Sequence, residues 1–372
     1  MGLAAKLAAA QANQGAYASP YPQAPQGAGV SAPYAPPAGP PPQQYAPPPQ
    51  QPARPSFDPT RDVATILRIL EEGVKDQNLA YFFPQGSLQP IAQRIAQTGA
   101  ISTLAQAWQL PLEVAMDMAR LALFDVSLLC DDSASMSFAE NGSRIDDLRL
   151  VLSKVALAAG LFDDDGIEIR WLNSKKEGNG IKTEAAANEL LGRIKFNRAT
   201  PLGSSLRSKI LEPLVYKKVK KHALKKPLLI VIITDGEPTG EPRDTIVKAI
   251  MEAKQILGKT PYTPDAVSFQ LAQVGNDQEA RAFLEYIDTE PRIGSLVDCT
   301  SNYEIECDNM AKARPPVDLT PTLWLAKLLV SSPPRPIVVR SLTVSRSLTL
   351  VCSCSLDPFT RAGMLPCVLC RA

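Results

Sequence analysis

The sequence LFDVSLLCDDSASM, residues 123–136, has the pattern of a buried strand followed directly by a polar loop. The apolar run from Leu123 to Cys130 is typical of a strand that is covered on both faces. The loop that follows carries Asp131, Ser133 and Ser135 at alternate positions. One carboxylate and two hydroxyls, all of them oxygen ligands, therefore directly follow a buried strand.

The same alternation of short apolar strand and amphipathic helix continues along the chain. Further strand-like runs lie at 167–172, 228–233, 267–274 and, more weakly, 295–299. Helical spacing of apolar residues occupies 145–155, 185–194, 202–214, 245–257 and 279–287. This pattern predicts an α/β fold with a doubly wound, mostly parallel, Rossmann-like sheet. In such sheets, ligands bind beyond the carboxyl ends of the strands.

Two more oxygen ligands lie where this fold would place them. Thr200 precedes a helix in ATPLG, residues 199–203, and Asp235 ends a strand in IITDGEP, residues 232–238. We expect the strands before Asp131 and Asp235 to be adjacent, which would bring the two carboxylates together. Two carboxylates and three hydroxyls suit a hard divalent cation, Mg²⁺ first, with Mn²⁺ or Ca²⁺ as alternatives.

Together, Asp131-x-Ser133-x-Ser135, Thr200 and Asp235 resemble the metal-ion-dependent adhesion site of von Willebrand factor A domains, particularly the intracellular and fungal-type members. The resemblance covers residues 121–312. It implies that the three hydroxyls bind the metal and that the two aspartates act directly or through ordered waters. It also implies that one coordination position stays open for an Asp or Glu carboxylate of a protein partner.

The function implied by this resemblance is cation-dependent protein binding by an adaptor or scaffold, not catalysis. Two alternatives stay open: a structural module whose metal only stabilises the fold, and a metal-dependent phosphohydrolase. An aspartyl phosphatase would need a second aspartate at the position of Ser133. A phosphate-binding loop at Gly258-Lys259-Thr260 would need a glycine at the position of Ala253.

Composition excludes other classes of function. The single histidine, His222, lies in a lysine-rich stretch and is expected at the surface, which argues against catalytic triads and imidazole-rich zinc sites. The 39 basic and 38 acidic residues balance, so no general attraction to nucleic acid is expected. The sequence has no apolar run near the ~20 residues of a membrane span, and we expect a cytoplasmic protein.

The sequence divides into further segments around the main domain. Residues 1–57 contain no Asp or Glu and 14 of the 34 prolines, which predicts a disordered region, with proline-recognising modules as candidate partners. Residues 58–120 predict three or four short helices that pack against the main domain, with an independent module as the alternative. A C-terminal helix is expected at 313–331.

Two clusters of similar residues admit more than one interpretation. Six lysines between 217 and 226 favour a solvated helix end, with binding of an anion or acidic partner as the alternative. The tail at 332–372 is expected to be poorly ordered, but four cysteines in it have spacings that zinc sites use. They are Cys352, Cys354, Cys367 and Cys370. The other three, Cys130, Cys299 and Cys307, fit reduced thiols.

Overall fold

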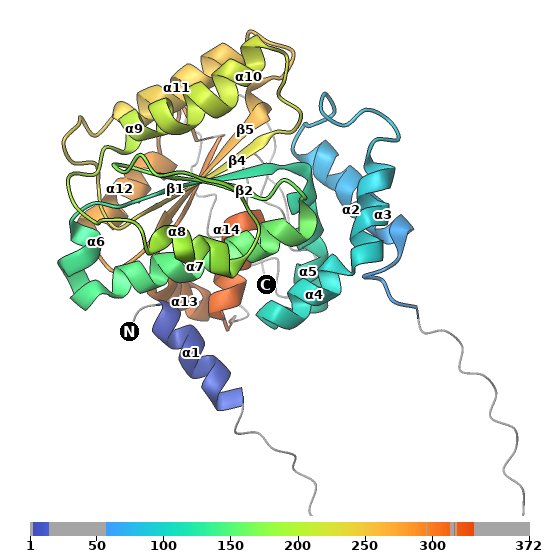
Figure 1. Ribbon diagram of the computed structural model, residues 1–372, viewed down its shortest axis with the longest axis horizontal. Helices are drawn as coiled ribbons and strands as arrows, with labels where there is room; N and C mark the ends of the chain where they lie inside the picture. The colour runs from blue at the N-terminus through green and yellow to red at the C-terminus, as the bar shows by residue number, and fades with distance from the viewer. Residues whose placement is uncertain (1–2, 15–56, 295, 313–315, 317, 331–372) are drawn as a thin grey trace, which may run out of the picture.

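A six-stranded sheet forms the centre of the computed structural model, which describes residues 3–14, 57–294, 296–312, 316 and 318–330 (Figure 1). The strand order is β3-β2-β1-β4-β5-β6, and only the β2–β3 pair is antiparallel. The strands are β1 (Asp125–Cys130), β2 (Ile167–Trp171), β3 (Gly178–Ile181), β4 (Leu228–Thr234), β5 (Val267–Gln273) and β6 (Val297–Thr300). This arrangement confirms the predicted doubly wound α/β fold.

The strands that directly precede Asp131 and Asp235, β1 and β4, are neighbours, as predicted. β1 runs parallel to β4 with Cys130 opposite Ile233, and the Asp131 N–H donates to the Ile233 carbonyl at 2.9 Å. The chain winds outward from β1 in one direction and from β4 in the other, so the strand order reverses between them. Doubly wound sheets bind their ligands at such a switch point.

One strand was not predicted. β3 has the sequence Gly-Asn-Gly-Ile and offers no apolar run or alternation by which a strand is recognised. It pairs with β2, and its first residue, Gly178, lies against helix α8 (Glu184–Leu191). A Cβ at Gly178 would come within 2.6 Å of Leu190 Cδ2, so any larger residue there would displace the Leu190 side chain. The five predicted strands are confirmed, with ends shifted by one or two residues.

Successive residues of the central strands point into two separate hydrophobic cores, because side chains alternate across a sheet. Leu128 belongs to one core and Leu129 to the other. The first core is covered by α7 (Ser143–Phe162), α8, α13 (Tyr303–Lys312) and α14 (Pro321–Val330). The second is covered by α9 (Leu202–Ser205), η3 (Leu206–Tyr216), α10 (Lys217–Lys220), α11 (Thr245–Leu257) and α12 (Gln278–Asp288). Figure 1 shows α9, α10 and α11 above the sheet, and α7, α8 and α14 below it.

The segment at 58–120 forms four helices that share the first core. They are α2 (Val63–Asp76), α3 (Leu88–Thr98), α4 (Ala100–Trp108) and α5 (Leu112–Asp117), followed by η1 (Met118–Leu123). Their apolar residues join those of α7 and α14 in one hydrophobic cluster. Three short elements lie in the loops of the sheet domain: α6 (Ser135–Phe138), η2 (Ala139–Gly142) and η4 (Pro264–Ala266). The helical segment therefore packs against the sheet domain and shares its core.

The ends of the chain differ in part from the prediction. Leu3–Gln14, expected to lack structure, form helix α1, whose Ala4 N–H donates to Asp147 on α7 at 2.9 Å. Alanine, leucine and lysine favour helix, and Leu3 gains a buried position, which outweighs the absence of a strong sequence pattern. The expected helix at 313–331 is α14, which begins at Pro321. Residues 15–56 and the tail at 332–372, with its four cysteines and the zinc alternative, lie outside the described residues.

Among the described helices, none is long and apolar enough to cross a membrane. Among the residues that the structure describes, Cys130, Cys299 and Cys307 form no disulfide with one another.

Candidate metal site

Asp131 and Asp235 leave the carboxyl ends of the neighbouring strands β1 and β4, and both side chains are fully buried. Both oxygens of Asp131 are fixed. Oδ1 accepts from the Ser133 N–H at 2.8 Å, and Oδ2 accepts from the Thr234 hydroxyl at 2.7 Å. Thr234, the last residue of β4, thus orients a carboxylate that comes from β1.

Serine hydroxyls connect the two carboxylates. Ser133 Oγ and Ser135 Oγ lie 3.0 Å apart, and the Ser135 hydroxyl donates to Asp235 Oδ1 at 3.0 Å. Four of the five predicted ligands therefore form one hydrogen-bonded cluster at the switch point of the sheet. Ser135 begins the short helix α6 and is less buried than the other three, so it lies on the side of the cluster nearest to solvent.

The fifth predicted ligand, Thr200, lies on a loop that is bonded to the other two. The Ala134 N–H donates to the Arg198 carbonyl at 3.1 Å, which ties this loop to the one after β1. The Thr200 N–H donates to the Thr239 hydroxyl at 2.9 Å, and the Thr239 N–H donates to the Thr200 carbonyl at 3.2 Å. Three loops that are distant in sequence thus meet at one edge of the sheet.

Asp132, which sequence reasoning did not single out, supports this meeting of loops. Its carboxylate accepts from the backbone N–H of Asn173 at 2.7 Å and of Ser174 at 2.8 Å. The Asn173 side chain in turn donates to the Ala199 carbonyl at 2.9 Å. Asp132 therefore holds the segment after β2 against the Thr200 loop.

The electrostatics of the cluster favour a cation. Burial, and after it the negative charge of Asp235, together raise the pKa of Asp131 to about 7, against the hydrogen bonds from Ser133 and Thr234, which lower it. Two buried carboxylates this close repel each other unless a positive charge lies between or beside them. Because the surrounding donors are hydroxyl and carboxylate oxygens, the residues fit a hard divalent cation such as Mg²⁺.

Arg144 brings a positive charge to the site, and sequence reasoning did not identify it. Its Nη1 lies 2.6 Å from Asp235 Oδ2, and its side chain is only 6% exposed. A signal was present, since the buried stripe of α7 at Leu148 and Val151 continues back to Arg144 at helical spacing. A charged residue in line with an apolar stripe predicts a buried ionic partner.

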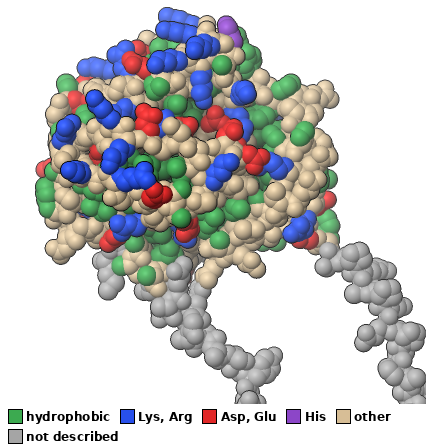
Figure 2. Space-filling model, viewed as in Figure 1, with side chains coloured by type: hydrophobic (Ala, Val, Ile, Leu, Met, Phe, Trp, Pro, Cys, Tyr) green, Lys and Arg blue, Asp and Glu red, His purple; other side chains and the backbone are tan. Residues whose placement is uncertain are grey.

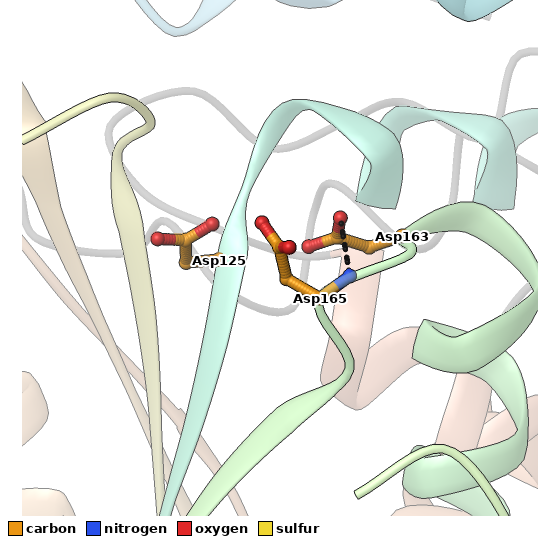
Figure 3. A group of neighbouring side chains, drawn as sticks. All are labelled: Asp125, Asp163 and Asp165. Atoms are coloured by element: carbon orange, nitrogen blue, oxygen red, sulfur yellow. Dashed lines mark hydrogen bonds between the residues drawn. The ribbon is translucent and has the colours of Figure 1, made fainter. Parts of the chain in front are cut away.

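A second group of acidic residues lies at the opposite, amino-terminal edge of the sheet (Figure 3). Oxygens of Asp125, Asp163 and Asp165 lie within 4.8 Å of one another. Two lysines compensate part of this charge: Lys226 Nζ is 2.8 Å from Asp163, and Lys218 Nζ is 3.9 Å from Asp125. No motif in the sequence predicts this group, because its members lie at the start of a strand or between a helix and a strand.

The lysine run therefore contributes in part to ion pairs. Lys218 and Lys226 contact the acidic group, whereas the other four members are exposed: Lys217, Lys220, Lys221 and Lys225. Figure 2 shows basic side chains gathered at the top of the view, over α10 and α11. His222 is exposed there, as predicted.

Comparison with models of protein families gave no match, and comparison with curated proteins gave none either.

Proposed function

We propose that this chain binds a partner protein through a divalent cation held by Asp131, Ser133, Ser135, Thr200 and Asp235. The observation that carries the proposal is the oxygen cluster of two buried carboxylates and two linked hydroxyls at the switch point of the sheet. The proposal includes membership of the von Willebrand factor A family, on the motifs by which the sequence resembles it.

The residues have distinct tasks in this proposal. Asp131 and Asp235 supply the negative charge, and the hydroxyls supply neutral ligands. The partner approaches from the side of Ser135, the least buried member of the cluster. When bound, Mg²⁺ or a similar cation supplies an open coordination position that attracts an Asp or Glu carboxylate.

Affinity capture from native lysate tests the proposal. The full chain should retain its partners in Mg²⁺ and release them in EDTA. Asp131→Ala and Asp235→Ala should lose the same partners, because each change removes one of the two carboxylates that balance the cation. Asp308→Ala, which alters an exposed carboxylate on α13, is the matched control and should bind as wild type does.

Other outcomes separate the alternatives. If Mg²⁺ raises the melting temperature but capture is unchanged by EDTA and by Asp131→Ala, the site only stabilises the fold. Release of phosphate from a small phosphate ester, lost in Asp131→Ala, would support a phosphohydrolase instead.

A further inference from the structure

Asp235 already has a cationic partner within the chain. Its Oδ2 accepts from Arg144 Nη1 at 2.6 Å, while its Oδ1 accepts from the Ser135 hydroxyl. Asp131, by contrast, is held by a backbone N–H and a threonine hydroxyl, both of them neutral donors. Within the part of the chain that the structure describes, the two carboxylates of the candidate site are thus unequal: Asp235 is ion-paired and Asp131 is not.

The position of Arg144 is fixed from several sides. Its Nε donates to Glu140 Oε1 at 3.0 Å, and the same oxygen accepts from the Asn276 N–H at 3.0 Å. Glu140 and Asn141 both have left-handed backbone, with φ of 50° and 55°, which non-glycine residues seldom adopt. The turn that presents Glu140 is therefore held by its surroundings.

Gly275, in the loop after β5, leaves the space that this arrangement needs. A Cβ there would come within 2.6 Å of Arg144 Nε and 2.8 Å of Glu140 Oε1. Three segments, the turn before α7, α7 itself and the loop after β5, thus combine to hold one buried guanidinium against Asp235.

We propose that Arg144 is a built-in cation that sets how tightly the site holds its metal ion and makes the loaded site attractive to a carboxylate. The inference rests on the proposed function, since it concerns the same site. Asp131, Asp235 and Arg144 together carry one net negative charge, which a divalent cation converts to one net positive charge. Without the guanidinium the loaded cluster would be neutral.

Arg144 has opposite effects on the two steps of binding. It repels an incoming divalent cation and so weakens metal affinity, because like charges a few ångström apart in a buried site interact strongly. The net positive charge that remains after loading favours an anionic ligand. Glu140, whose side chain is 27% exposed, lies behind the guanidinium and moderates its charge.

Titration calorimetry of the full chain with MnCl₂, repeated with MgCl₂, tests the inference. Arg144→Met should bind Mn²⁺ at least tenfold more tightly than wild type, although its metal-free melting temperature should fall because Asp235 loses its counter-charge. Arg144→Lys keeps the charge and should stay near wild type. Glu140→Gln keeps the acceptor oxygen but removes the negative charge behind the guanidinium, so its Mn²⁺ affinity should fall severalfold.

These opposite shifts distinguish a charge effect from a structural one, since a purely structural contact would weaken Mn²⁺ binding in both variants. Equal or weaker Mn²⁺ binding by a folded Arg144→Met protein would overturn the inference. If Arg144→Met does not fold, Glu140→Gln decides: unchanged or tighter binding overturns the inference. Absence of Mn²⁺ binding by wild type would instead remove the proposed function and this inference with it.

Discussion

Asp131 makes the metal-free protein sensitive to pH. Its folded-state pKa of about 7 lies above the ordinary value of 3.8, so the folded state binds a proton more tightly than the unfolded state does. The stability that this proton contributes is fully present below the ordinary pKa and is lost as pH rises through about 7. In EDTA, we expect the melting temperature of wild type to fall between about pH 5 and about pH 8.

Asp131→Asn checks the origin of this slope. The amide imitates the protonated carboxyl, so the variant should show a smaller slope than wild type and melt above it at the alkaline end. Part of the slope should remain, because burial also raises the pKa of Asp117, Asp147 and Asp298 to about 6. Adding Mg²⁺ should raise the melting temperature of wild type, by mass action, and leave the variant unchanged. A variant that retains the whole slope would assign it to other groups.

Thr200→Ala should separate binding from folding. Loss of one hydroxyl should cost about 1 kcal/mol of stability, which urea unfolding would measure. Because the hydroxyl is one of the proposed metal ligands, capture of the partner in Mg²⁺ should fall by much more than this cost implies. Equal capture by wild type and variant would remove Thr200 from the ligand set.

At the level of helices, α9 and α11 approach each other so closely that only glycine fits between them. A Cβ at Gly203 would lie 2.4 Å from Ile246 N and 2.5 Å from Thr245 C, both backbone atoms of α11. Gly203→Ala should therefore force the helices apart and destabilise the protein by about 1–3 kcal/mol. Since α9 begins two residues after Thr200, Mg²⁺ binding should weaken as well.

Gly192→Ala is the matched control. A Cβ there would make ordinary contacts, at 3.5 Å from the Asn188 carbonyl, and the backbone is right-handed with φ of −60°. Its stability should equal or exceed that of wild type, since alanine restricts the unfolded chain more than glycine does. If urea unfolding gave both variants the same midpoint, the close approach of α9 and α11 would be irrelevant to stability.

At the scale of the whole molecule, the helices at 58–120, the sheet and α14 should unfold together. The three tryptophans report on these parts, because Trp108 lies on α4, Trp171 on β2 and Trp324 on α14. All three are buried in the same hydrophobic cluster. A shared core predicts one cooperative transition.

Tryptophan fluorescence and far-ultraviolet circular dichroism should therefore give the same urea midpoint. Deletion of 58–120 should expose the first core and yield a protein that binds hydrophobic dyes or precipitates. Two separate transitions, or a well-folded deletion variant, would show that the helical segment is an independent module.

Local sequence patterns determined much of this protein. Runs such as Leu228–Thr234 are apolar enough to specify a buried strand wherever they lie, and the alternation of strand and helix then permits few sheet topologies. Asp131 and Asp235 were identifiable because each directly follows such a strand, and the edge at which parallel strands end is fixed by their direction.

Only the tertiary structure decided the rest. β3 is a strand because β2 offers it a partner and α8 covers it, not because of its own residues. Arg144 contacts Asp235, which is 91 residues away in the sequence, and Lys226 contacts Asp163, which is 63 residues away. No local sequence pattern therefore predicts either pair. The sequence determined what each short segment favours, whereas long-range packing decided which charges meet, because a buried charge is stable only beside the partner that the fold supplies.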